Sequence, residues 1–177
     1  MIINGQNDLL LSDIMKYYEK NKNFDSMLKI INGESKISLR IIDWFTTNYA
    51  KKHFTIFKNK HDNRFKVYDN YKLKLKAYKK SRFDPFCRWD RIQVPFGDQN
   101  LSIETTLGQL NFFKWALEND IIQYIENNYD IIEKDMNNNN TLSKRKYTKT
   151  RKKREELSIS ALRSLKKENI DVVLKFK

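Results

Sequence analysis

The sequence predicts an α+β protein, in which helices pack on a small, mostly antiparallel sheet and a basic arm leads to a C-terminal helix and strand that dock on the fold. Three observations support this class. Segments near both ends of the first 136 residues repeat apolar residues every three or four positions, as amphipathic helices do. Segments between them alternate apolar and polar residues, which indicates half-buried strands. Apolar residues then almost vanish over 137–153, which is typical of a linker.

The first fifty residues are expected to form helical scaffold. Residues 8–20 carry two adjoining apolar stripes at helical spacing, and residues 25–32 form a second, shorter helix that ends at Gly33. The segment 37–52 fits a strand in its first half and a helix throughout. We favour the helix, with Ser38 as its N-cap.

The segment 65–78 is the most informative part of the chain. Six of its seven odd-numbered positions are apolar or aromatic, and four of its seven even-numbered positions are lysine. As a strand paired with 53–57 across a polar turn, it would bury one face and expose a ladder of lysines on the other. We therefore expect a hairpin at this point.

A third strand is expected over 87–94, because Pro85 and Pro95 bracket it and exclude a long helix. Residues 106–136 then predict two helices, the first capped by one of the two threonines at its start and separated from the second at residues 119–120.

The chain is therefore expected to divide into three parts. Residues 1–136 form the α+β core domain, and 137–153 form a mobile arm rich in Asn and Lys. Residues 154–177 predict a helix followed by a strand that alternates apolar and polar residues. Such an element docks either on the sheet of its own chain or on a second copy, so a swapped homodimer is one expected arrangement.

The charge is strongly segregated along the chain. With 35 Lys and Arg against 22 Asp and Glu, the net charge is +13; it is zero over 1–50, +9 over 51–100, −5 over 101–140 and +9 over 141–177. Codons rich in A and T explain part of the lysine excess, since the chain also has 19 Asn and only four Ala. Base composition does not explain the segregation, which indicates a partner rich in phosphate.

Composition excludes several other classes of protein. The single Cys87 excludes an internal disulfide and a multi-cysteine zinc site, and no apolar stretch approaches the roughly 20 residues of a membrane helix. We expect a soluble, intracellular protein that has no cofactor and no membrane partner.

No catalytic constellation is evident. The two histidines, His53 and His61, have no cysteine beside them and lack the spacing of metal ligands. The acidic residues after 117 are spread over the polar faces of helices, which is typical of a solvated surface. A faint nuclease pattern of Asp62, Asp69 and Lys72 leaves a magnesium-dependent nuclease as the weakest alternative.

Nucleic-acid binding is the function that the basic residues favour. Lysines act as point charges for phosphates, and arginines add bidentate contacts. No motif that reads bases is present, so binding is expected to tolerate sequence. The predicted DNA- or RNA-binding residues are Lys66, Lys72, Lys74, Lys76, Arg82, Arg88, Arg91, Lys144, Arg145, Lys146, Lys149, Arg151, Lys152, Lys153 and Arg154.

Four sequence blocks resemble a family of small basic proteins of nucleocytoplasmic large DNA viruses, the giant viruses. They are SLRIIDWFTTNYAKK (38–52), YKLKLKAYKKSRFDPFCRWDRI (71–92), TTLGQLNFFKWALENDIIQYI (105–125) and KKREELSISALRSL (152–165). The resemblance covers most of the chain from Ser38 and carries no catalytic residues.

The resemblance implies a viral protein in the host cytoplasm, at the viral factory, or in the virion, with a role in DNA packaging or late gene expression. The main alternative is a virion or assembly module whose basic arm binds an acidic protein.

Overall fold

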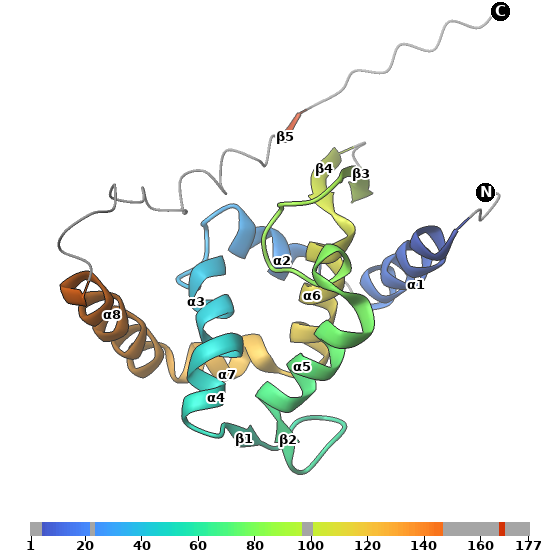
Figure 1. Cartoon of the computed structure of the whole chain (residues 1–177). Coiled ribbons are helices and arrows are strands. Elements are labelled where there is room, and N and C mark those ends of the chain that lie inside the picture. The colour runs from blue at the N-terminus through green and yellow to red at the C-terminus, as the bar shows by residue number, and fades with distance from the viewer. Residues whose placement is uncertain (1–4, 22–23, 97–100, 147–166, 169–177) are drawn as a thin grey trace, which may run out of the picture.

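The computed structural model describes residues 5–21, 24–96, 101–146 and 167–168, and it confirms the α+β class (Figure 1). In chain order the elements are α1 (Gln6–Asn21), α2 (Phe24–Ile31), α3 (Leu39–Trp44), the π-helix η1 (Phe45–Tyr49), α4 (Ala50–Lys52), β1 (Ile56–Phe57), β2 (Phe65–Lys66), α5 (Val67–Tyr78), the 3-10 helix η2 (Lys80–Arg82), β3 (Arg91–Phe96), β4 (Leu101–Thr106), α6 (Leu107–Glu118), α7 (Ile121–Asn127), α8 (Tyr129–Lys146) and β5 (Lys167–Glu168).

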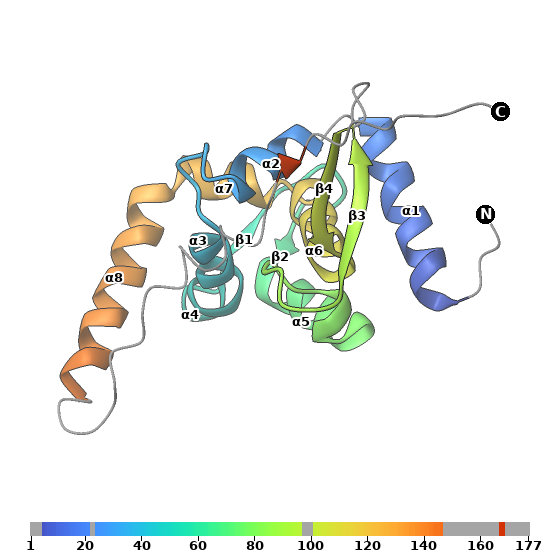
Figure 2. The same cartoon turned by 90° about the horizontal axis from the view of Figure 1, so that it is seen from above.

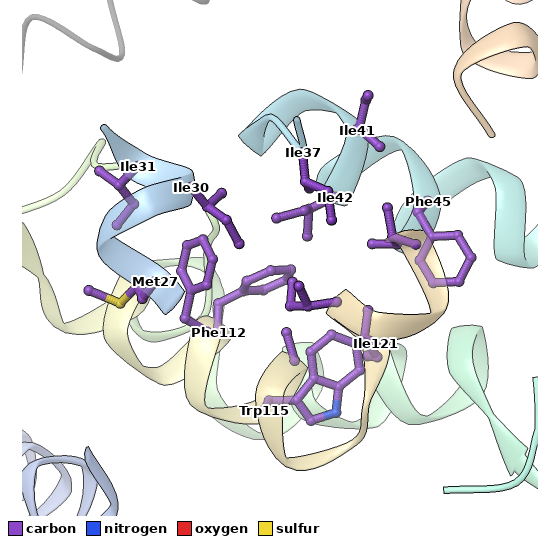
Figure 3. Packing of buried hydrophobic residues seen from close by; sticks show 14 of the residues in the cluster. Met27, Ile30, Ile31, Ile37, Ile41, Ile42, Phe45, Phe112, Trp115 and Ile121 are labelled. Carbon is purple, nitrogen blue, oxygen red and sulfur yellow. The ribbon is translucent and has the colours of Figure 1, made fainter. Parts of the chain in front are cut away.

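Helix α6 lies at the centre of the molecule. Figures 1 and 2 show α1, α2, α5 and the β3–β4 hairpin arranged around it. Every residue from Gly108 to Phe113 is buried, as are Trp115 and Ala116. Figure 3 shows Ile30 of α2 and Ile42 of α3 on one side of Phe112 and Trp115, and Ile121 beside Trp115. A helix that is buried around most of its circumference is stable only when other elements cover it on those sides.

The backbone before β3 approaches the first turn of α6 unusually closely. A Cβ atom added to Gly108 would lie 3.0 Å from the carbonyl oxygen of Ser81 and 3.2 Å from the nitrogen of Phe83. Only glycine leaves room for this approach.

Side chains of α6 hold the same segment by hydrogen bonds. The Gln109 amide donates to the carbonyl oxygen of Pro85 at 2.9 Å, and the Asn111 amide donates to that of Arg82 at 2.8 Å. Both amides are buried, so these bonds satisfy groups that would otherwise be costly to bury.

The predicted helix over 37–52 is confirmed. The Ser38 hydroxyl accepts a hydrogen bond from the backbone N–H of Ile41 at 3.3 Å, so Ser38 is the expected N-cap. α3, η1 and α4 follow one another without a break in the chain, and η1 is a single π turn within this continuous helix. Inside it the Thr46 hydroxyl donates to the carbonyl oxygen of Ile42 at 3.1 Å. Both N-terminal helices and the helix predicted before the break at 119–120 are also present, whereas the single helix predicted after it is divided at Asn128 into α7 and α8.

The predicted strand over 65–78 is wrong. Only Phe65 and Lys66 form a strand, pairing antiparallel with β1, and the chain then turns into α5. Val67 and Tyr71 lie on one side of this helix and are buried. Leu73, which breaks the apolar stripe, is simply exposed, with 66% of its surface accessible. Packing against α6 therefore outweighs the alternation in the sequence, as tertiary contacts often do.

The strands lie in two sheets rather than one. β1 and β2 form a two-stranded sheet, and β3, β4 and β5 form a three-stranded sheet in that order. The predicted strand 87–94 is displaced to 91–96, and it contains Pro95 opposite Ser102. β3 is an edge strand, where a proline need not donate on its outer side. The strand at 101–106 was not predicted; Thr106, at its end, caps α6 as one of the two expected threonines.

The predicted arm does not begin at residue 137. α8 continues to Lys146, and the Asn139 amide donates to the carbonyl oxygen of Asp135 within it. Residues 147–153, most of the predicted helix at 154–169 and the whole predicted strand at 170–177 lie outside the described residues. Lys167 and Glu168, near the end of the predicted helix, instead form a short strand that pairs with β4 of the same chain. The division into a core, an arm and a docking element stays a prediction.

Gly108→Ala is expected to destabilise the protein by about 1–3 kcal/mol, because the added methyl group meets backbone atoms that cannot rotate away. Gly5→Ala is the matched control, since a Cβ at Gly5 would contact nothing within 4 Å. Urea unfolding of the two variants measures the difference, and equal stability would show that the segment 81–86 can move.

Candidate nucleic-acid interface

The structure divides the predicted lysine ladder between two elements. Lys66 is exposed on β2, whereas Lys72 and Lys76 are exposed on α5. Lys74 is half-buried, with its Nζ 6.0 Å from the centre of the Tyr78 ring. Successive residues of an α-helix are about 100° apart, so Lys74 lies on nearly the opposite side from Lys76. The four lysines do not form one ladder.

A different set of side chains does share one face of α5. Tyr68, Lys72 and Lys76 lie on successive turns of the helix. Lys51, from α4, places its Nζ 5.7 Å from the centre of the Tyr68 ring. We call these four residues the α5 strip. Lys72 and Lys76 also line an open hollow of about 560 Å³ together with Asp69, Leu73 and Leu75.

The predicted arginines are occupied by contacts within the protein. Arg88 makes a bidentate pair with Asp84, whose side chain is only 2% exposed, through Nε at 2.9 Å and Nη2 at 2.8 Å. Arg91 pairs with Glu104 on the neighbouring strand. Arg82 donates from Nη1 to the side-chain oxygen of Gln6 at 3.2 Å.

Asp84 organises the turn that leads into β3. Besides Arg88, its carboxylate accepts the backbone N–H of Phe86 at 3.1 Å and the indole N–H of Trp89 at 3.2 Å. Arg88 therefore neutralises a buried carboxylate, and the hydrogen bond to Asp84 raises the pKa of the guanidinium. This contact explains why 87–90 is a turn and not the start of the predicted strand.

A second carboxyl lies near this pair. Burial raises the pKa of Asp43, although the positive charge of Arg88 opposes the shift. Burial, together with the charges of Asp43 and Asp84, also raises the pKa of Tyr71 to about 12. The surroundings of Arg88 thus hold two partly or fully buried acids, and its positive charge serves the fold.

The remaining positive charge is concentrated in residues 51–82. This segment has twelve Lys and Arg against two Asp, a net charge of +10, whereas 83–100 has two against three. Within the described part of the chain, only Lys52 and Lys60 of these twelve form ion pairs. Of the other ten cations, Arg82 donates to Gln6 and Lys74 lies against Tyr78, and the remaining eight form no ion pair within the described residues.

The acidic helices meet separate lysines. Asp120 pairs with Lys60 at 3.1 Å, and Asp130 pairs with Lys36 at 3.3 Å. Asp62, from the faint nuclease pattern, accepts the backbone N–H of Arg64 in the turn between β1 and β2.

Among the described residues, no three His, Cys, Asp or Glu side chains gather so that they could hold a metal ion. In the same residues no helix is both long and apolar enough to cross a membrane.

The structure describes little of the predicted basic arm. Lys144, Arg145 and Lys146 lie on the last turn of α8. Lys149, Arg151, Lys152, Lys153 and Arg154 lie outside the described residues.

Sequence reasoning missed Lys51 as part of the basic surface. It belongs to the expected helix 37–52, which was read as scaffold. Only the contact of α4 with α5 places it beside Tyr68, and that contact joins segments whose pairing the sequence does not show.

Asp135 connects α8 to α3 and α4. Its carboxylate accepts the indole N–H of Trp44 at 3.0 Å and pairs with Lys52, and the Nε2 atom of His53 lies 3.6 Å away. Burial alone would raise the pKa of Asp135, but hydrogen bonds from Lys52, Trp44 and His53 bring it below its ordinary value.

Asp135→Asn is expected to lower the free energy of unfolding at neutral pH by about 1–2 kcal/mol, because Lys52 loses its charged acceptor. The unfolded chain takes up the proton of Asp135 at a higher pH than the folded chain does, so the stabilisation is present above the ordinary carboxyl pKa and is lost as the pH falls below it. Urea unfolding at neutral and acid pH tests this. Asp130→Asn, at an exposed pair on the same helix, should have almost no effect; an undiminished difference for Asp135→Asn in acid would contradict the assignment.

Arg88→Ala is expected to destabilise the protein by about 3 kcal/mol, because it leaves the buried Asp84 without its counter-charge. Thermal unfolding measures this. If Arg88→Ala is as stable as the wild-type protein but binds nucleic acid more weakly, Arg88 belongs to the binding surface and the assignment is wrong.

Comparison with known proteins places the chain in a family. A protein of Acanthamoeba polyphaga mimivirus, itself uncharacterized, is 43% identical over 157 residues, which cover 80% of this chain and 60% of the mimivirus protein. The chain thus matches less than two thirds of that relative's length. No solved structure matches the chain. The resemblance to a giant-virus family is confirmed. Because the model of the family of unknown function DUF7197 matches residues 3–176, the chain belongs to that family.

Proposed function

We propose that this protein binds nucleic acid through the phosphate backbone, tolerates sequence and catalyses no reaction. The observation that carries the proposal is the charge of +10 on residues 51–82, of which ten cations form no ion pair within the described residues. Elsewhere in the described chain, basic side chains such as Arg88, Arg91 and Lys114 pair with carboxylates. Among the described side chains, segment 51–82 therefore holds most of the cations that form no ion pair; Lys16, Lys29, Arg40 and Lys134 are the others.

The location of the segment supports the proposal. Figure 1 shows α4, β1, β2 and α5 together at the lower end of the molecule, so the charge lies on one side of the fold. Lys72 and Lys76 of the α5 strip lie one helical turn apart, and Lys51 joins them from α4 beside Tyr68. Each lysine that meets a phosphate releases a counterion, and this release makes binding favourable at low salt and weaker as salt increases.

The basic residues from 144 to 154 would extend the contact. In this proposal they follow the phosphates beyond the surface formed by residues 51–82, as basic segments do. We further propose that such binding takes place in the host cytoplasm, during packaging or late gene expression, or in the virion; viral origin is all that the giant-virus relative adds in support.

One observation favours a second candidate, a module for protein assembly. Leu73 is exposed between Lys72 and Lys76, so this part of α5 combines an apolar side chain with positive charge. An acidic protein with a small apolar patch would suit the same face. A pull-down with and without nuclease separates the candidates, because a protein partner survives removal of nucleic acid.

Replacing Lys72 and Lys76 together by Glu should weaken binding of a labelled DNA duplex and flatten the slope of log Kd against log salt concentration by about two. The matched control replaces Lys16 and Lys29 by Glu, which changes the net charge equally on exposed faces of α1 and α2. Fluorescence anisotropy across a salt series measures both. Equal losses in the two variants would mean that net charge alone drives binding, and affinity independent of salt would reject the proposal.

A further inference from the structure

Phe54 is the most exposed of the large apolar side chains that the structure describes, with 84% of its surface accessible. Its backbone is also unusual, because its φ of 46° lies in the left-handed region that side chains other than glycine rarely adopt. Lys79, at the end of α5, has a φ of 62° and is one of two other such residues in the described chain. Two of these three strained positions therefore lie within segment 51–82, which carries most of the unpaired positive charge. Backbone strain of this kind tends to gather at functional sites.

The neighbours of Phe54 hold it in this conformation. The backbone N–H of Thr55 donates to the carbonyl oxygen of Ala50 at 3.1 Å, and the carbonyl oxygen of Thr55 accepts from Val67 at 3.3 Å. Thr55 is itself buried. On the N-terminal side of Phe54, the centre of the His53 ring lies 4.3 Å from the centre of the Tyr49 ring. The ring of Phe54 is thus held on a fixed backbone and directed away from the core.

The hairpin of β1 and β2 also carries side chains that face away from the core. Phe57 and Phe65 pair and face the core, with ring centres 5.6 Å apart. Because side chains alternate along a strand, Ile56 and its partner Lys66 face outward, as does Lys58. Ile56 has 45% of its surface accessible. We call Phe54, Ile56, Lys58 and Lys66 the hairpin face; its two lysines form no ion pair within the described residues.

We propose that the hairpin face binds an unpaired base, with the ring of Phe54 stacked on the base and Lys58 and Lys66 beside the flanking phosphates. This inference rests on the proposed function and specifies its ligand as single-stranded nucleic acid. An exposed aromatic ring among lysines is the combination that binds single strands without regard to sequence, since every base has a face that can stack. Because backbone hydrogen bonds already fix the chain beside Phe54, little backbone entropy is lost on binding.

The surroundings favour a nucleic acid over a lipid surface. A loop that enters a membrane carries its apolar residues at the tip, whereas the tip of this hairpin reads KNKHDNR (58–64). The apolar pair, Phe54 and Ile56, lies instead at the base of the hairpin, next to Lys51 and the α5 strip. A strand that stacks on Phe54 can therefore continue along a row of positive charge.

The test compares three labelled ligands by fluorescence anisotropy: oligo(dT) of about 20 nucleotides, an abasic strand with the same number of phosphates, and a duplex of the same length. The wild-type protein should bind oligo(dT) more tightly than the abasic strand. Phe54→Ala should weaken oligo(dT) binding about tenfold, leave the abasic strand unaffected and keep the salt slope, because no charge is removed. Leu9→Ala, at an exposed apolar residue of α1, is the matched control and should change nothing.

Further variants guard against a folding artefact. Phe54→Tyr should retain oligo(dT) binding, and Phe54→Gly, which suits the left-handed backbone, replaces Phe54→Ala if the latter does not fold. Phe54→Trp should add an indole emission that oligo(dT) quenches and the abasic strand does not.

The outcomes separate this inference from the proposed function. Salt-dependent binding that is equal for oligo(dT) and the abasic strand overturns the role of Phe54 and leaves the proposed function intact. Absence of salt-dependent binding to all three ligands overturns both. If Phe54→Ala loses binding to phosphatidylserine vesicles and keeps full affinity for oligo(dT), the hairpin face is a lipid site and the inference is wrong.

Discussion

The close packing of residues 81–86 on the first turn of α6 is the constraint on which the rest of the structure depends. With no side chain at Gly108, the backbone comes near enough for Phe83 to enter the core, where its ring contacts those of Phe112 and Trp115. Phe83 also contacts Tyr71, and the indole N–H of Trp115 donates to Asn70, so α5 is fixed on α6 by its inner side. The side of α5 that carries Lys72 and Lys76 faces outward as a result.

The charges of the protein fall into two groups with different physical roles. Moving Arg88 away would leave the buried carboxylate of Asp84 without its counter-charge. Arg91 forms an ion pair with Glu104 on the neighbouring strand. Such cations add little to the field outside the molecule. Lysines on long, solvated stems, such as Lys72 and Lys76, pay no comparable cost of desolvation. The field of the protein is therefore set by fewer residues than its sequence suggests.

Much of the fold could be predicted from the sequence, because the helices that carry regular apolar stripes pack through those stripes. The segment 65–78 could not, since an alternating pattern and a helical one both place Val67 and Tyr71 inside; the choice is made by Trp115, 44 positions from Tyr71 in the chain. The candidate site could not be predicted in full for the same reason, because it too depends on contacts between residues that are distant in the chain. Lysine content indicated where positive charge is concentrated, but whether an individual cation forms an ion pair depends on a carboxylate elsewhere, as Glu104 shows for Arg91.

The π turn η1 has a consequence for how this surface can change. A turn closed by an i→i+5 hydrogen bond holds one residue more than an α-helical turn, so everything after it is rotated by about 100° around the axis. Lys51 faces Tyr68, and Lys52 faces Asp135, only with that extra residue present. Loss or gain of a single codon between 45 and 49 would redirect the end of the helix and the ring of Phe54 with it. Relatives whose chains differ in length at this point are therefore expected to differ in the directions of the side chains at Lys51, Lys52 and Phe54.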